Sequence, residues 1–260
     1  MPRFAANLSL MFNEVDFIAR FQRAARAGFA AVEFLFPYAH DADEIARQLA
    51  AHDLDLVLFN APPGDWQAGE RGLAALPGRQ AEFRAGIEDA LIHAERLHCP
   101  RVHVMAGNMA APADFDAMHE TFLDNLAHAA RRFAEYGITA LIEPINTRDM
   151  PAYFLSRQAA AHAIVHELGA TNVAVQMDFY HAQIMDGDVW DTFRAGRDRI
   201  GHIQIAGVPE RHEPDDGELN YPWLFERLDA AGYAGWIGCE YTPRDDTEAG
   251  LAWFAPWRRG

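Results

Sequence analysis

Eight short apolar runs alternate with longer amphipathic stretches from one end of this 260-residue chain to the other. Most of the runs are continuously apolar, which is typical of parallel strands covered on both faces. The expected strands are Phe4–Leu10, Ala31–Phe36, Leu54–Asn60, Arg101–Gly107, Thr139–Glu143, Val173–Asp178, Gly201–Ala206 and Trp236–Tyr241. Because eight strand–helix units need about 250 residues, the sequence predicts an α/β fold, a (β/α)8 TIM barrel in a single domain spanning residues 1–260.

Helical periodicity fills the stretches between the runs. One set of apolar residues recurs at helical spacing, which places it on a single helix face: Phe115, Met118, Phe122, Leu126 and Phe133. Glycine recurs where a helix gives way to a strand, a position that suits the left-handed conformation. These glycines are Gly28, Gly137, Gly169 and Gly232. An open doubly wound sheet is the alternative fold, but its glycine-rich G-x-G-x-x-G turn does not occur here.

The charge of the chain excludes several classes of partner. Its 22 basic and 38 acidic residues give a net charge of -16, so no positive surface for nucleic acid or an anionic membrane is expected. All the basic residues are arginine, and without lysine the chain cannot form a Schiff base or a P-loop.

Cys99 and Cys239 stand far apart and are expected to be buried and free. With neither a signal peptide nor a membrane span, we expect a cytoplasmic protein that acts on a small molecule. A homo-oligomer is compatible with these features.

Polar residues end four successive strands, the fifth to the eighth. Glu143, Asp178 and Glu240 close their apolar runs, and Gln204 lies near the end of another, at intervals of 35, 26 and 36 residues. Each interval is about one strand–helix unit, so the four side chains are expected to converge at the carboxyl end of the barrel, where active sites of this fold form. An acidic residue that ends one strand is often only a helix cap, but three acidic residues and a glutamine on four neighbouring strands favour a joint site.

Three carboxylates brought together repel one another unless a cation or shared protons offset the charge. Three charged oxygen ligands and one amide oxygen suit Mg²⁺ or Mn²⁺ better than zinc. We therefore interpret Glu143, Asp178, Gln204 and Glu240 as a divalent metal site.

Further polar residues are candidates for binding substrate. His181 follows Asp178 by three residues and could polarise a carbonyl or hold a hydroxyl group. Arg71, in the long irregular segment Asn60–Arg79, and Arg211 could each pair with a substrate carboxylate. Two other features are interpreted as incidental. These are the histidines His93, His98 and His103, and the acidic segment Arg211–Glu218, which is expected to be a solvated loop.

The chain resembles the hydroxypyruvate isomerase family, which includes 2-oxo-tetronate isomerases and is related to the xylose isomerase-like barrels. The resemblance covers essentially the whole chain. Its motifs are PRFAANLSLMF, AGFAAVEFLFPY, APPGDWQAGERGLAALPGR, VHVMAG, HIQIAGVPERHEPDDGELNYPWLF and GWIGCEYTPR.

The resemblance implies a TIM barrel with a divalent metal held by Glu143, Asp178, Gln204 and Glu240, and it makes the two glutamates the acid and base. Related sugar epimerases have a histidine where Gln204 stands, so the glutamine favours isomerases of small keto acids. The expected reaction interconverts hydroxypyruvate or a 2-oxo-tetronate with its carbonyl-shifted isomer through an enediolate, for example hydroxypyruvate with tartronate semialdehyde. Which glutamate acts as base stays open.

Three alternatives use the same barrel. A metal-dependent sugar epimerase or a sugar-acid dehydratase would share the metal site, and a non-catalytic barrel would only bind a sugar acid. An endonuclease of the apurinic type needs a histidine-rich zinc cluster and a basic groove, which the strand ends and the charge of -16 argue against.

Overall fold

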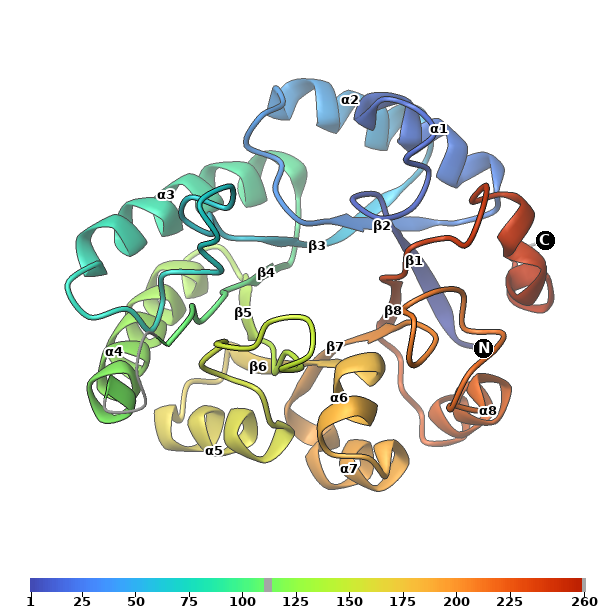
Figure 1. The fold of residues 1–260 in the computed structure, drawn as a ribbon. Coiled ribbons are helices and arrows are strands. Elements are labelled where there is room, and N and C mark those ends of the chain that lie inside the picture. Colours follow the sequence, from blue (N-terminus) through green and yellow to red (C-terminus); the bar gives the residue numbers. More distant parts are fainter. Residues whose placement is uncertain (110–113, 259–260) are drawn as a thin grey trace.

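The computed structural model describes residues 1–109 and 114–258, and its strands form one closed barrel (Figure 1). Neighbouring strands pair in parallel and in chain order, and β8 pairs with β1 to close the ring. The strands are β1 (Arg3–Asn7), β2 (Ala31–Phe34), β3 (Asp55–Asn60), β4 (Arg101–His103), β5 (Thr139–Ile142), β6 (Val173–Asp178), β7 (Ile200–Ile205) and β8 (Trp236–Cys239). The predicted (β/α)8 barrel is confirmed.

Helices surround the ring of strands and cover its outer face (Figure 1). The α-helices are α1 (Phe17–Arg26), α2 (Ala42–Ala51), α3 (Gln80–Leu97), α4 (Phe115–Ala134), α5 (Gln158–Leu168), α6 (Phe179–Met185), α7 (Val189–Gly196) and α8 (Tyr221–Ala230). Two 3-10 helices, η2 (Arg197–Arg199) and η3 (Ala249–Trp257), complete the described elements. No helix in the described part of the chain has the length and apolar character needed to cross a membrane.

The main core lies between the strands and the surrounding helices. On α4 the predicted apolar face is buried at Met118, Phe122, Leu126 and Phe133, whereas Phe115 at its first turn is 50% exposed. The four predicted glycines all have positive φ, and Gly169 caps α5 in the left-handed conformation. Both cysteines are buried and free, as expected.

Several strands are shorter than their expected runs, and the differences are largest at the ends of β1 and β4. β1 ends at Asn7 because the backbone N–H groups of Leu10 and Met11 turn back to bond its carbonyl oxygen, at 3.2 and 2.8 Å. After β4, the chain leaves the sheet. Its carbonyl oxygens at Met105 and Ala106 instead accept hydrogen bonds from the long segment that follows β3.

That segment runs from the end of β3 to the start of α3 and lies against the residues after β4. Ala75 N–H donates to the carbonyl oxygen of Ala106 at 2.7 Å, and Gly72 forms an isolated antiparallel bridge with Ala106. Gly72 has a φ of 111°, and a Cβ there would lie 2.3 Å from the carbonyl oxygen of Met105. Only glycine therefore permits this close approach of the two backbones.

Candidate active site

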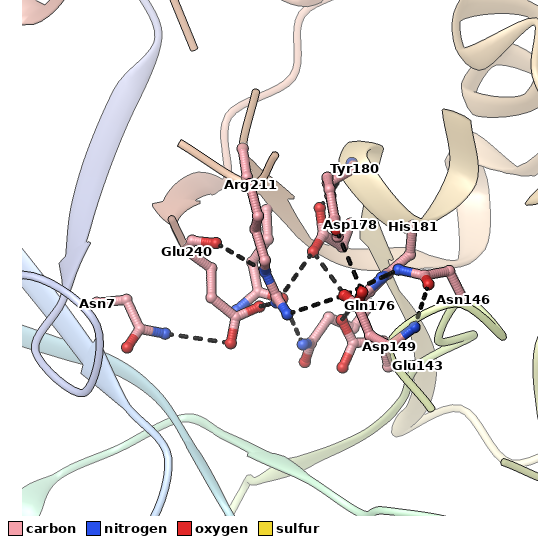
Figure 2. A network of polar contacts seen from close by, with 12 residues as sticks. Asn7, Glu143, Asn146, Asp149, Gln176, Asp178, Tyr180, His181, Arg211 and Glu240 are labelled. Carbon is pink, nitrogen blue, oxygen red and sulfur yellow. Dashed lines mark hydrogen bonds and ion pairs between the residues drawn. The ribbon is translucent and has the colours of Figure 1, made fainter. Parts of the chain in front are cut away.

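Three buried carboxyl groups lie at the carboxyl ends of barrel strands (Figure 2). Glu143 directly follows β5, Asp178 is the last residue of β6, and Glu240 directly follows β8. Because active sites of this fold form at the carboxyl ends of the strands, residues at these positions can reach the mouth of the barrel. The structure therefore brings together the three acidic residues that the strand ends predict.

The two carboxylate oxygens of Asp178 have different surroundings. Oδ1 accepts the backbone N–H of Tyr180 at 2.8 Å and caps α6. Oδ2 is buried and has no hydrogen-bond partner among the described residues. The helix cap thus fixes the carboxylate so that its other oxygen faces the site.

Glu143, Asp178 and His181 form a compact group whose nearest ligand atoms all lie within 4.8 Å of one another. The Nε2 atom of His181 is 3.6 Å from Asp178 Oδ2 and 4.0 Å from Glu143 Oε1. Like Asp178 Oδ2, Glu143 Oε1 is buried without a hydrogen-bond partner in the described part of the chain. Two unsatisfied acceptors on neighbouring carboxyls are costly to bury, and a cation or a proton between them removes that cost.

Glu240 lies beside this group and is paired with Arg211. The Arg211 guanidinium is 3.0 Å from Glu240 Oε2, 3.8 Å from Asp178 Oδ2 and 3.5 Å from Asp149 Oδ2 (Figure 2). Its central carbon also lies 5.1 Å from the centre of the Tyr180 ring. Arg211 is therefore placed between the carboxyl groups of Glu240, Asp178 and Asp149, where it offsets part of their negative charge.

Arg211 belongs to the acidic segment after β7, and that segment is not the solvated loop that the sequence suggested. Glu213 is buried and accepts the backbone N–H of Arg244 at 3.2 Å. Only the residues from Asp215 to Glu218 are exposed. The interpretation therefore holds for Asp215–Glu218 only, because Arg211 reaches the site carboxyls and Glu213 is buried against Arg244.

Gln204 lies on β7 at the floor of the mouth, in a polar layer that crosses the barrel. Its Nε2 donates to Glu33 Oε1 at 2.7 Å, and its Oε1 accepts from Gln176 at 2.5 Å. Glu33, on β2, also contacts Nε2 of His202 at 2.7 Å and accepts from Asn7 at 3.1 Å. Glu33 therefore fixes the Gln204 amide with its nitrogen toward β2 and its oxygen toward β6.

Burial makes the site carboxyls weak acids. It raises the pKa of Glu240 to about 8 although Arg211 lowers it, and it raises the pKa of Asp178 to about 6. The pKa of Glu143 is raised by burial and further by Glu240 and Asp178. Burial has the opposite effect on His181, whose pKa is well below its usual value. The site thus favours the protonated form of its acids and the neutral form of the His181 imidazole.

The chemistry of these side chains fits a hard divalent cation. Glu143 and Asp178 each turn an unpartnered oxygen toward the same point, and Glu240 supplies a third carboxyl nearby. Carboxylate and amide oxygens are the ligands that Mg²⁺ and Mn²⁺ prefer.

Some residues of the site carried no recognised signal in the sequence. His103 ends β4 and is buried with its Nδ1 3.6 Å from Glu143 Oε2, so its interpretation as incidental was wrong. The rule that selected the acidic residues, a polar residue at a strand end, missed His103 because the strand was expected to continue to Gly107, whereas β4 ends at His103. Asn146 contacts His181 from the loop after β5, where the sequence contains no comparable pattern.

Arg71 lies away from these contacts. Its guanidinium stacks 3.9 Å from the centre of the Trp66 ring and donates to the carbonyl oxygens of Trp66 and Glu70. These bonds hold it within the long segment after β3, on the rim of the barrel.

Comparisons with known proteins agree with this architecture. Residues 21–257 match the family model described as a xylose isomerase-like TIM barrel. A 2-oxo-tetronate isomerase of Cupriavidus necator is 60% identical over 99% of both chains. The chain belongs to the hydroxypyruvate isomerase family. Another member, a hydroxypyruvate isomerase of Escherichia coli, is 44% identical over 99% of this chain and all of its own length.

The fold is shared with solved structures as well. A protein described as an AP endonuclease, family 2, from Brucella melitensis is 57% identical over the full length of both chains, with a TM-score of 0.98. A 3-keto-D-glucoside 4-epimerase of E. coli has a TM-score of 0.82 at 20% identity, covering 98% of this chain and 99% of its own. This second likeness concerns the fold alone. The resemblance to hydroxypyruvate isomerases drawn from the sequence motifs is confirmed.

Proposed function

We propose that this member of the hydroxypyruvate isomerase family interconverts a small 2-keto-3-hydroxy acid with its carbonyl-shifted isomer. Hydroxypyruvate and the 2-oxo-tetronates, named for its relatives in E. coli and C. necator, are the substrate class. The observation that carries the proposal is the set of three buried carboxyls at the mouth, with a glutamate at about pKa 8 among them. A group with a pKa near the working pH can both remove and return a proton.

Glu143, Asp178, Gln204 and Glu240 would hold a divalent ion, with Mg²⁺ or Mn²⁺ best matched to their oxygens. When bound, such an ion supplies Lewis acidity to the carbonyl and hydroxyl oxygens of the substrate.

Glu143 and Glu240 act as the acid and base pair. One carboxylate takes the proton from the hydroxyl-bearing carbon next to the carbonyl, and the electron pair moves onto the carbonyl oxygen to give an enediolate. The other carboxyl gives a proton to the former carbonyl carbon, and the proton of the hydroxyl oxygen moves to the former carbonyl oxygen, so the product has the same composition as the substrate. Positioned proton transfer of this kind typically contributes about 10²–10⁴-fold to the rate.

Arg211 and His181 bind the polar groups of the substrate. Arg211 is positioned by Glu240 and Asp149 and offers its guanidinium to the substrate carboxylate or a hydroxyl group. His181 contacts both Glu143 and Asp178 and is neutral, which suits a hydrogen bond to an uncharged substrate oxygen. Arg71 on the rim is the second candidate for the carboxylate.

The test is an assay with hydroxypyruvate and the 2-oxo-tetronates, with chelator, Mg²⁺ or Mn²⁺, and with the products identified by NMR. We expect metal-dependent isomerisation of at least one acid, and a loss of at least about 100-fold in kcat for Glu143→Gln and Glu240→Gln. Glu248→Gln, a surface carboxylate paired with Arg23, is the matched control. A product that has lost a hydroxyl group would replace the proposal with a dehydratase. An inverted stereocentre would replace it with an epimerase, and no turnover on any acid would replace it with a binding protein.

A further inference from the structure

Asn146 is held by its own loop in one amide orientation. Its Oδ1 accepts the backbone N–H groups of Arg148 and Asp149, both at 2.9 Å. An amide oxygen accepts and an amide nitrogen only donates, so these two bonds decide which end of the side chain is which. The amide nitrogen consequently points the other way, toward Asp149 Oδ2 at 3.1 Å and the Nδ1 atom of His181 at 2.6 Å (Figure 2).

We propose that Asn146 sets the tautomer of His181, leaving Nδ1 unprotonated and placing the single ring proton on Nε2, between Glu143 and Asp178. Both hydrogens of the Asn146 amide are then used, one on Asp149 and one on His181. Because Nδ1 receives a hydrogen bond, the proton of the neutral ring lies on Nε2. Asn146 is the positioning residue, and His181 is the group that it presents.

The tautomer decides whether His181 binds a metal ion or donates a hydrogen bond, which the distances alone do not decide. Glu143, Asp178 and His181 lie close enough together to hold one ion. A ring nitrogen that carries a proton has no lone pair to give to a metal, however, so His181 is outside the ligand set. The ligands are then the oxygen donors, with Glu240 and Gln204 completing the pair Glu143 and Asp178.

The Nε2–H group instead donates a hydrogen bond into the mouth of the barrel. The turn at Asn146 thus places this donor next to both unpartnered carboxyl oxygens, 4.0 Å from Glu143 Oε1 and 3.6 Å from Asp178 Oδ2. In the proposed isomerisation it would stabilise the negative charge that develops on the substrate oxygen. This catalytic consequence rests on the proposed function, whereas the tautomer does not.

The tautomer is measured directly by long-range ¹H–¹⁵N correlation NMR on the metal-free, ¹⁵N-labelled protein, with the His181 signals assigned by their loss in His181→Gln. We expect the wild-type protein to have a protonated Nε2 and an unprotonated Nδ1. In Asn146→Asp the side chain keeps acceptors for the loop but offers an acceptor to the ring, so Nδ1 is expected to gain a proton. Asn220→Asp is the matched control, because Asn220 also caps a backbone N–H, that of Trp223, at an exposed site.

A wild-type ring protonated on Nδ1, or an unchanged tautomer in Asn146→Asp, would overturn the proposal. The wild-type spectrum decides the question even where the variant does not fold.

Manganese affinity, measured by electron paramagnetic resonance, provides a second readout. His181→Gln is expected to raise the Mn²⁺ dissociation constant by no more than about 100-fold, the range for a residue that only contacts the ligands, and a larger loss would make His181 a ligand. Wild-type protein that binds no Mn²⁺ but has the expected tautomer would refute the proposed metal site and leave the inference about Asn146 intact.

Discussion

Replacing Glu240 with glutamine is expected to stabilise the metal-free protein, and to do so increasingly as the pH rises. Burial raises the pKa of Glu240 to about 8 in the folded chain, against an ordinary value of 4.5. The folded protein therefore binds this proton more tightly than the unfolded chain does. Stability from this group is present in full below pH 4.5 and is lost as the pH rises toward 8.

The size of the effect follows from the two pKa values. Each tenfold change in acidity corresponds to about 1.4 kcal/mol, so ionising Glu240 costs the folded state roughly 3 kcal/mol at pH 7 and roughly 5 kcal/mol at pH 9. Glutamine has nearly the same shape and no charge to bury. We expect the stability gain of Glu240→Gln to grow by about 3 kcal/mol between pH 6 and pH 9.

The assay is guanidinium chloride unfolding followed by circular dichroism at pH 6, 7.5 and 9, with EDTA present throughout. Glu248→Gln, whose carboxylate is half-exposed and paired with Arg23, is expected to show no such trend. A gain that does not change with pH, or a variant less stable than wild type at pH 9, would refute the reasoning. Either result would mean that Arg211 fully compensates the burial of Glu240.

Three further perturbations test other parts of the structure. Gly238→Ala is expected to destabilise the barrel by about 1–3 kcal/mol in thermal unfolding, since its Cβ would lie 2.3 Å from Glu33 Oε2; an unchanged melting temperature would contradict the packing of the polar layer. Arg211→Gln is expected to lower kcat/KM by at least about 100-fold and to lower stability at pH 8, because the carboxyls around it lose their cation; a variant with wild-type turnover would remove Arg211 from the site. Phe122→Ala, fully buried on α4, is expected to cost about 3–5 kcal/mol in denaturant unfolding with little change in KM; a loss below 1 kcal/mol would place it outside the core.

The elements of the barrel could be predicted because their signal is local. A run of apolar residues long enough for a buried strand is visible in the sequence, and the polar residue that ends it marks the mouth, as at Glu143 and Asp178. The predicted ends of the strands were less accurate, because hydrogen bonds outside the sheet decide where a strand stops. β1 stops at Asn7 because a turn takes its carbonyl oxygen, which the apolar run through Leu10 does not reveal.

The supporting residues of the site could not be predicted, because their positions depend on tertiary contacts. Glu33 lies within an apolar strand and meets Gln204 only because β2 and β7 face each other across a closed barrel. Asn146 reaches His181 through the shape of a loop. The spacing of residues along the chain does not reveal that Glu33 lies next to Gln204 or that Asn146 lies next to His181.

The long segment after β3 combines two kinds of position within a few residues. Gly72 is wedged against the backbone of Met105, while a side chain at Gly69 or Gly78 would meet nothing within 4 Å. Insertions at the outer turn near Gly69 should therefore leave the barrel intact, whereas a single added methyl group at Gly72 would displace the segment from the residues that follow β4. A designer who wishes to reshape the rim thus finds open space at Gly69, where the positive φ of 93° still favours glycine, and none at Gly72, three residues further on.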